Sequence, residues 1–173
     1  MNNRIISEEE KEFLANYDAN KYPKPCVTVD NIIYFLGEKT KLLWVLMVKR
    51  KNYPYKGCWA LPGGFLDVGK ENTEQATLRE LQEETSLELK NTKLFGVYSD
   101  PDRDPRDHVV SVVYATEVKK LDLDLCAQDD AEEVAFMRIN HEGKAADAHW
   151  TPVEVAFDHN KILQDFQKSV SGK

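Results

Sequence analysis

The stretch Gly63–Leu87, GGFLDVGKENTEQATLRELQEETSL, places a glycine pair, a helix and a dense group of carboxylates within 25 consecutive residues. We predict that the helix begins near Asn72, whose side chain can cap the free N–H groups of the first turn while Gln75 reaches back to the Asn72 backbone. The helix is expected to end near Thr85. The rest of the chain is expected to form the framework that supports this segment.

One face of the predicted helix is acidic. Residues three and four positions apart share a helix face, so Glu80, Glu83 and Glu84 project together, with Arg79 at the margin. The residues expected to face the core are Leu78, Leu81 and Thr85. Like charges one turn apart cost roughly 0.2–0.5 kcal/mol each, so a compensating cation is expected, and Mg²⁺ suits an all-oxygen site. The alternative interpretation is a solvated acidic face with an ordinary Arg79–Glu83 ion pair.

The same stretch resembles the Nudix box, G-x5-E-x7-R-E-U-x-E-E-x-G-U with U an aliphatic residue, of the Nudix hydrolases. The matching positions are Glu71, Arg79, Glu80, Leu81, Glu83, Glu84 and Leu87. Six residues separate Gly64 from Glu71 where the pattern has five, so Lys70 is interpreted as an insertion, and Ser86 replaces the last glycine. Serine tolerates the left-handed conformation that ends a helix less well than glycine, at a cost of about 1 kcal/mol.

The insertion also creates G-x4-G-K over residues 64–70, which is the beginning of a phosphate-binding P-loop. A P-loop has a Ser or Thr at the next position, whose hydroxyl holds Mg²⁺. Here Glu71 occupies that position and would repel phosphate. The Nudix interpretation is therefore preferred.

Length, charge and cysteine content exclude several classes of protein. A chain of 173 residues is expected to form one domain, and its formal net charge of −7 argues against a nucleic-acid or anionic-membrane binder. The three cysteines form no C-x-x-C pair, which argues against a disulfide framework or a zinc site. The longest purely apolar run, residues 42–48, is too short to span a membrane. We expect a cytoplasmic protein.

The resemblance continues outside the box. Residues 59–65 (WALPGGF), 98–108 (YSDPDRDPRDH) and 156–159 (AFDH) are similar to ADP-ribose pyrophosphatase members of the family. This resemblance implies an α/β fold, a Nudix-like α/β/α sandwich with a mixed β-sheet. It also implies Mg²⁺-dependent hydrolysis, with Mn²⁺ as an alternative metal, of a nucleoside diphosphate linked to another moiety. The expected partner is a small-molecule nucleotide, ADP-ribose giving AMP and ribose 5-phosphate, and such members are often homodimers.

The sequence divides into an N-terminal arm, residues 1–24, and a single domain, residues 25–173, which the resemblance identifies as a Nudix hydrolase domain with its box at residues 64–87. The arm is expected to contain a short helix capped at Ser7 and to pack on the domain. Strands are predicted over 26–36, 41–50, 88–98, 108–118 and 131–139, and a closing helix over 152–170. The first two strands are expected to form a hairpin.

The resemblance assigns the site residue by residue. The metal ligands it implies are the Gly64 carbonyl, Glu80, Glu83 and Glu84, and Arg79 would orient a catalytic carboxylate. The general base is either a helix glutamate, with Glu83 as the candidate, or a loop acid among Asp129, Asp130, Glu132 and Glu133, with Glu133 as the candidate. The role of Glu71 stays open because the insertion lies beside it.

Two loops are predicted to bind substrate. In the basic and aromatic loop 49–56, Arg50 and Lys56 can neutralise a diphosphate, and a tyrosine can stack on a base. In the loop 99–107, the guanidinium groups of Arg103 and Arg106 suit phosphate oxygens. The alternative for both loops is a solvated surface. The four histidines are scattered singly and are expected to be structural.

Two other functions were weighed. One is the clean-up of oxidised nucleoside triphosphates, which uses the same box with a different base pocket. The other is a non-catalytic ADP-ribose sensor of the kind found in transcription regulators. Those regulators carry a winged helix after the Nudix domain, and the roughly 30 residues after the last predicted strand are too few for one.

Overall fold

A computed structural model describes residues 6–119 and 131–171 of the chain. The elements, in chain order, are α1 (Glu8–Ala15), β1 (Cys26–Leu36), β2 (Leu43–Arg50), β3 (Trp59–Ala60), β4 (Gly63–Phe65), α2 (Thr73–Thr85), β5 (Lys93–Tyr98), β6 (Val109–Glu117), β7 (Ala131–Ile139), β8 (Ala145–Ala146) and α3 (His159–Ser171).

The strands form one mixed sheet in the order β5-β6-β1-β2-β7-β8, to which β3 and β4 add short pairings with β2 and β1. β1 and β2 form the predicted antiparallel hairpin. β1 pairs in parallel with β6, whereas the other neighbours are antiparallel. The strand β1 therefore lies in the middle of the sheet, and it contacts both the hairpin partner and the short strand that carries the glycine pair.

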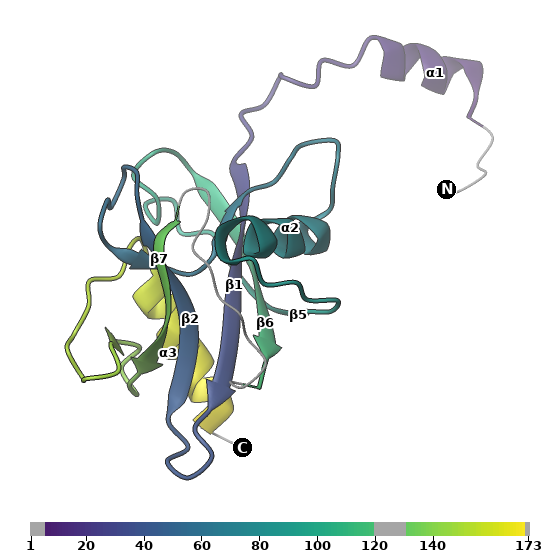
Figure 1. Ribbon diagram of the computed structural model, residues 1–173. Helices are drawn as coiled ribbons and strands as arrows, with labels where there is room; N and C mark the ends of the chain where they lie inside the picture. Colours follow the sequence, from purple (N-terminus) through teal and green to yellow (C-terminus); the bar gives the residue numbers. More distant parts are fainter. Residues whose placement is uncertain (1–5, 120–130, 172–173) are drawn as a thin grey trace.

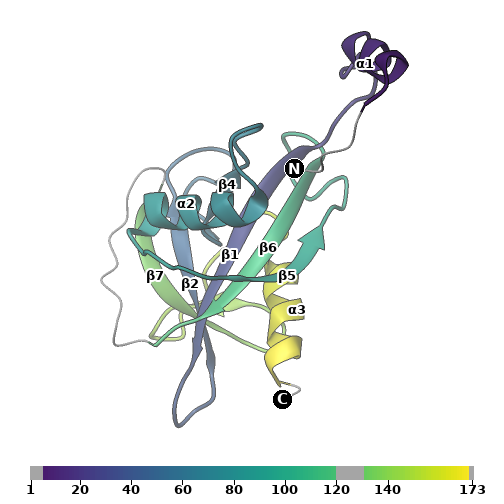
Figure 2. The same cartoon turned by 90° about the vertical axis from the view of Figure 1, so that its right-hand side faces the viewer.

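Alternate residues of the central strands face opposite sides of the sheet, and each side is covered by a helix (Figures 1 and 2). On one side, Ile32 packs in a core that includes Ile162 and Phe166 of α3. On the other side, Ile33 packs with Leu81 of α2 and with Leu87 just after it. Both central isoleucines are fully buried. The predicted α/β/α sandwich is confirmed.

The closing helix begins later than the sequence predicted, at His159 instead of near Pro152. The residues before it pair as extended chain: Val155 bridges Trp59, and Pro152 bridges Ala146. The Trp59 amide donates to the Glu154 carbonyl at 2.8 Å. These long-range backbone hydrogen bonds replace the first turns of the expected helix and place His159 beside β3.

The N-terminal helix α1 forms with its predicted cap, because the Ser7 side chain accepts a hydrogen bond from the Glu10 amide at 3.2 Å. The expectation that it packs on the domain is wrong, since none of its residues is buried and it stands clear of the sheet (Figure 2). Phe13 and Tyr22 are both 64% exposed. None of the helices in the described residues is long and apolar enough to cross a membrane.

Candidate active site

The helix α2 has the predicted ends. Asn72 is the N-cap: its side chain accepts from the Gln75 amide, and the Gln75 side chain accepts from the Asn72 amide, which completes a capping box. Ser86 ends the helix in the left-handed conformation, at φ 61°, although it is not glycine. The box therefore forms with its helical register intact in spite of the Ser86 departure.

The insertion at Lys70 is contained within a turn before the helix. The Lys70 amide donates to the Asp67 carbonyl at 3.0 Å, and Gly69 takes φ 80° at a point where an added Cβ atom would face open space. Glu71 follows directly and accepts a hydrogen bond from the Asp67 amide at 2.9 Å. Because the turn absorbs the extra residue, Glu71 still lies beside Arg79.

Arg79 holds three of the carboxylates of the box. Its Nε and Nη2 donate to the two oxygens of Glu71 at 3.0 and 2.6 Å. Its Nη1 donates to Glu80 at 2.7 Å and to Glu83 at 3.0 Å. The hydrogen bonds from Arg79 lower the pKa of Glu71. The predicted Arg79–Glu83 ion pair is thus present, but it is one part of a larger cluster in which a single guanidinium compensates three negative charges.

Glu84 lies apart from that cluster and is not on a solvated face. It is 9% exposed, and its Oε2 accepts a hydrogen bond from the Gly63 amide at 2.9 Å. Burial raises the pKa of Glu84 to about 8, and repulsion from Glu80 and Asp30 acts in the same direction. Burial also raises the pKa of Glu80. Glu80 is partly buried and already pairs with Arg79, whereas the buried Glu84 needs a further positive charge nearby before it ionises readily.

The glycine pair Gly63–Gly64 allows close approach of the backbone to its neighbours. A Cβ atom at Gly64 would lie 2.5 Å from the Glu80 carboxylate oxygen Oε1, and one at Gly63 would collide with the Val29 carbonyl. Backbone atoms exclude a side chain at Gly63, whereas a side chain at Gly64 would displace the Glu80 carboxylate. The backbone of Gly64 therefore lies directly against the Glu80 carboxylate, as it must if both bind the same metal ion.

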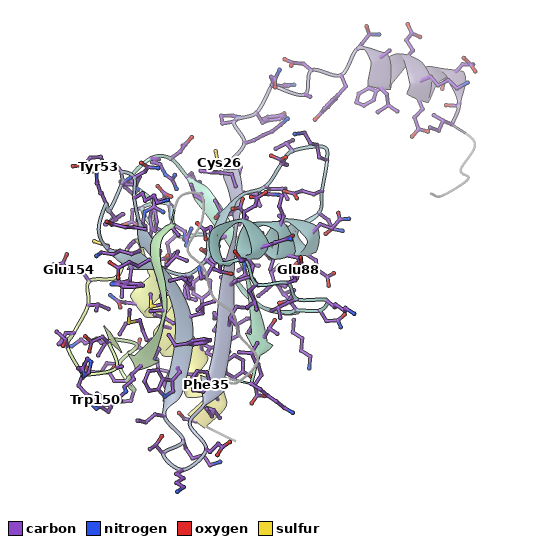
Figure 3. The ribbon with its side chains drawn as sticks, viewed as in Figure 1. Cys26, Phe35, Tyr53, Glu88, Trp150 and Glu154 are labelled. Carbon is purple, nitrogen blue, oxygen red and sulfur yellow. The ribbon has the colours of Figure 1, made fainter. Side chains whose placement is uncertain are left out.

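These residues line a cavity of about 370 Å³ at one end of the sheet. Figure 3 shows Tyr53 on the loop between β2 and β3, at the same end as Cys26, while Phe35 and Trp150 lie toward the opposite end. The acidic part of the lining comprises Glu80, Glu83, Glu84, Asp30, Asp67 and Asp104. The basic part comprises Arg50, Arg79, Arg103 and Arg106. Acidic and basic groups therefore line the same space.

The donor set fits a hard divalent cation, although it is not drawn together around one. Within residues 6–119 and 131–171, no three His, Cys, Asp or Glu side chains converge at metal-ligand spacing. Arg79 explains this, because it engages Glu80 and Glu83 directly. The uncompensated burial of Glu84 and the contact between Gly64 and Glu80 are the observations that favour a cation among carboxylate and carbonyl oxygens.

The two arginines of the loop 99–107 have different environments. Arg103 is buried, and its Nε and Nη2 donate to the two carboxylate oxygens of Asp158 at 3.0 and 2.6 Å. Arg106 is held by Asp104 at 3.0 and 2.7 Å, and its guanidinium lies 4.9 Å from the ring centre of Phe65. Arg103 therefore anchors the loop to the beginning of α3, whereas Arg106 presents a more exposed group to the cavity.

Other predicted residues lie elsewhere. Arg50 lines the cavity, where its Nε donates to the Pro54 carbonyl at 2.8 Å, but Lys56 is not among the lining residues. Glu133 also lies outside the lining, and it pairs with Lys49 on the neighbouring strand at 2.7 Å. Two further base candidates, Asp129 and Asp130, lie outside the described residues. The position of Glu133 gives no support to a catalytic role, which stays a prediction.

Two groups in the floor of the cavity were not predicted from the sequence. Asp30 is buried in β1, where it is the one charged residue of the strand CVTVDNIIYFL; a charge in a strand of mainly apolar residues was the available signal. His159 is buried at the first position of α3 and was counted only among the scattered histidines. Its nearness to Asp30 depends on a contact between residues 129 positions apart, which no local pattern reveals.

The chain was compared with known proteins. A family model described as "NUDIX domain" matches residues 27–166. An ADP-ribose pyrophosphatase of Methanocaldococcus jannaschii is 43% identical over 94% of this chain and 86% of that protein. An ADPR responsive transcriptional repressor, NtrR of Acinetobacter baylyi, is 30% identical over 95% of this chain and 62% of the repressor.

Among solved structures, the NUDIX domain of Shewanella oneidensis NrtR complexed with ADP ribose superimposes with a TM-score of 0.75 and 28% identity. The match covers 93% of this chain and 98% of that domain. Both the box geometry around Arg79 and the extent of these matches lead to one conclusion. The chain belongs to the Nudix family, and it is a Nudix pyrophosphohydrolase.

Proposed function

We propose that this protein hydrolyses ADP-ribose to AMP and ribose 5-phosphate with Mg²⁺, and that Mn²⁺ can replace Mg²⁺. The observation that carries the proposal is that the box residues Glu80, Glu83 and Glu84 line the same cavity as Arg50 and Arg106. One side suits a divalent cation, and the other suits a diphosphate beside the aromatic rings of Phe65 and Phe157. The similarity to an ADP-ribose pyrophosphatase supports this substrate.

The residues that would hold the metal are Glu80, Glu83, Glu84 and the Gly64 carbonyl. Nudix hydrolases use divalent metals, and the all-oxygen donor set favours Mg²⁺ or Mn²⁺ over softer ions. When bound, such a cation neutralises charge on the diphosphate and lowers the pKa of a water molecule. Arg79 keeps Glu80 and Glu83 in fixed orientations from the side of Glu71.

In the reaction, a water oxygen forms a bond to one phosphorus while the bridging P–O bond breaks. One phosphate leaves with the adenosine and the other stays with the ribose. The attacking water must give up a proton, and we propose Glu83 as the acceptor, because it lines the cavity and its side chain is 45% exposed. Glu133 is the second candidate, and its pairing with Lys49 outside the lining makes it the less favoured one.

On the opposite side of the cavity, Arg106 and Arg50 are proposed to neutralise the diphosphate. Arg106 lies between two rings, 4.9 Å from the centre of Phe65 and 5.5 Å from that of Phe157. Stacking fixes the plane of the guanidinium while Asp104 fixes its direction. A preorganised arginine loses less conformational entropy when phosphate binds.

A second candidate function is ADP-ribose sensing without cleavage, which the similarity to the NtrR repressor favours. The charged residues of the box are all present, including Glu71 in contact with Arg79, and this favours the enzyme, because a sensor needs no base or metal ligand. The clean-up of oxidised nucleotides remains a third alternative.

We further propose a cytoplasmic homodimer that acts on a free nucleotide and binds neither nucleic acid nor membrane.

The deciding experiment measures kcat/KM for ADP-ribose and for oxidised dGTP, with Mg²⁺ and with chelator, by chromatography of the products. AMP and ribose 5-phosphate in equal amounts from ADP-ribose, at the higher kcat/KM, are expected. A sensor would bind ADP-ribose in calorimetry with no turnover. A higher kcat/KM for oxidised dGTP would show that the substrate assignment is wrong, whereas the assignment of the reaction as pyrophosphate hydrolysis would stand. Light scattering after size exclusion tests the dimer.

A further inference from the structure

His159 connects the beginning of α3 to the backbone just ahead of the glycine pair. The ring is 3% exposed, and its Nδ1 accepts a hydrogen bond from the Leu61 amide at 2.9 Å. Because Nδ1 accepts, the ring hydrogen is on Nε2, which lies 3.4 Å from the Asp30 carboxylate. Burial lowers the pKa of His159, which keeps the ring neutral in this arrangement.

Asp30 in turn is fixed from several directions. Ser111 on β6 donates a hydrogen bond to it, and Nη2 of Arg103 lies 3.9 Å away. In the pairing of β1 with β4, Asp30 stands opposite Gly63. The imidazole therefore spans two rigid supports, the central strand β1 and the start of α3, and it holds the Leu61 amide between them.

The segment that His159 holds has few tethers of its own. β3 ends at Ala60 and β4 begins at Gly63, so Leu61 and Pro62 belong to neither strand. The Pro62 carbonyl accepts from the Asn31 amide at 2.8 Å. The Leu61 amide has no strand partner of this kind, and Leu61 is buried, so loss of the imidazole would leave a buried donor unsatisfied.

The next residues of this segment contact the proposed metal ligands. The Gly63 amide donates to Glu84, and Gly64 lies against the Glu80 carboxylate. We propose that His159 is a positioning residue for the metal site: by holding the Leu61 amide it fixes the backbone that orients Glu84 and presents the Gly64 carbonyl. The inference rests on the proposed function only in taking Gly64, Glu80 and Glu84 as metal ligands.

The test uses two variants that separate the two nitrogens of the ring. In His159→Asn the side-chain oxygen can take the place of Nδ1 and keep the bond from Leu61. In His159→Gln the polar group reaches the Nε2 position and that bond is lost. Mn²⁺ binding is measured by electron paramagnetic resonance in the absence of substrate, and kcat and KM for ADP-ribose are measured at saturating Mn²⁺.

We expect His159→Gln to weaken Mn²⁺ binding about ten-fold and to lower kcat about ten-fold with little change in KM, whereas His159→Asn stays within about three-fold of the parent. Phe166→Leu, in the same helix but packed against Phe95 and Tyr34, is the control for a general loss of stability. It should lower the melting temperature and leave Mn²⁺ affinity unchanged.

Equal Mn²⁺ affinities for the Asn and Gln variants, or a loss in Phe166→Leu as large as in His159→Gln, would overturn the positioning role. If the parent binds Mn²⁺ without cleaving ADP-ribose, the substrate proposal fails, and the Mn²⁺ series still decides the role of His159. If the parent binds no Mn²⁺, the metal site and this inference fail together.

Discussion

The Glu84 carboxylate accepts a hydrogen bond from the Gly63 amide at 2.9 Å, which joins the last turn of α2 to the glycine pair ahead of it. Arg79 compensates Glu71, Glu80 and Glu83, and its hydrogen bonds do not extend to Glu84. Among the box glutamates, the buried Glu84 is therefore the one that Arg79 leaves uncompensated. Its ionisation should make the stability of the protein depend on pH.

The first prediction concerns Glu84→Gln in the presence of chelator. The pKa of Glu84 is about 8 in the folded protein, above its value of about 4.3 in an unfolded chain. Between these values the folded state holds a proton that the unfolded state has lost, so the free energy of unfolding of the parent falls as pH rises. Glutamine does not titrate. The melting temperature of Glu84→Gln minus that of the parent should therefore increase between pH 5 and pH 8.

Thermal melts at both pH values, with chelator and with excess Mg²⁺, measure this difference. Added Mg²⁺ should stabilise the parent more than Glu84→Gln, because stabilisation grows as RT ln(1 + [L]/Kd) and the variant has lost a ligand. If Mg²⁺ stabilises the parent and Glu84→Gln equally and the variant hydrolyses ADP-ribose near the parent rate, Glu84 is not a metal ligand.

The second prediction concerns Arg79→Ala. This change leaves three neighbouring carboxylates without their shared cation, so the metal-free protein should lose about 1–3 kcal/mol of stability. Hydrolysis should fall by at least about 100-fold, because Glu80 and Glu83 lose their fixed orientations. Arg79→Lys should restore little, since one ammonium cannot make four hydrogen bonds in these directions.

Chelator melts and steady-state kinetics on the same preparations check the Arg79 result. Glu84→Gln is the comparison, because it changes a neighbouring carboxylate that Arg79 does not contact and is expected not to destabilise the protein. An Arg79→Ala protein as stable as the parent in chelator would show that solvent, and not Arg79, screens these carboxylates.

The third prediction separates Arg106 from Arg103. Arg106→Ala should raise KM for ADP-ribose by about ten-fold or more with a small change in melting temperature, because its guanidinium faces the cavity. Arg103→Ala should instead lower stability by about 3–5 kcal/mol, since it removes a buried guanidinium that is the bidentate partner of the partly buried Asp158. Lys168→Ala, on the outer face of α3, serves as the control.

Kinetics and melts of the three variants give both quantities. An unchanged KM in Arg106→Ala would contradict a role of Arg106 in substrate binding and would favour the alternative that the loop 99–107 is a solvated surface. If Arg103→Ala keeps its stability and raises KM alone, then Arg103 contacts the substrate directly, as the sequence first suggested.

The fourth prediction identifies the general base. Glu83→Gln should lower kcat by about 10²–10⁴-fold, the usual contribution of a positioned base. Glu133→Gln should keep kcat within about three-fold, because Glu133 pairs with Lys49 outside the lining of the cavity. Turnover numbers at saturating ADP-ribose and Mg²⁺ distinguish the two. A large loss in Glu133→Gln alone would reverse the assignment.

Local patterns in the sequence predicted much of this fold. The capping residues of α2 and the bounds of β1 and β7 agree with the prediction, because helix caps and runs of Val and Ile act over a few residues. The acidic helix face was also predicted, but the burial of Glu84 was not. Whether a helical carboxylate meets solvent depends on what packs over it, here the Gly63 turn.

The errors arose where a distant partner decides the outcome. Residues 152–158 follow a helical pattern, but hydrogen bonds with Trp59 hold them extended. Arg103 and Arg106 occupy similar positions in one charged loop, and only the location of Asp158 makes the first an anchor. His159 gave no local signal, because its partners Leu61 and Asp30 lie on other elements.

The turn that contains Lys70 shows which spacings in the box are physically constrained. The interval from Glu71 to Arg79 crosses a capped helix, where one added residue would rotate Arg79 by about 100° away from its carboxylates. The interval from Gly64 to Glu71 crosses a surface turn, where Gly69 faces open space and the Lys70 side chain is 76% exposed. A search pattern with a rigid five-residue spacer would reject this chain although its geometry is preserved. The same turn is a suitable place to attach a fluorescent label that reports on the site without entering it.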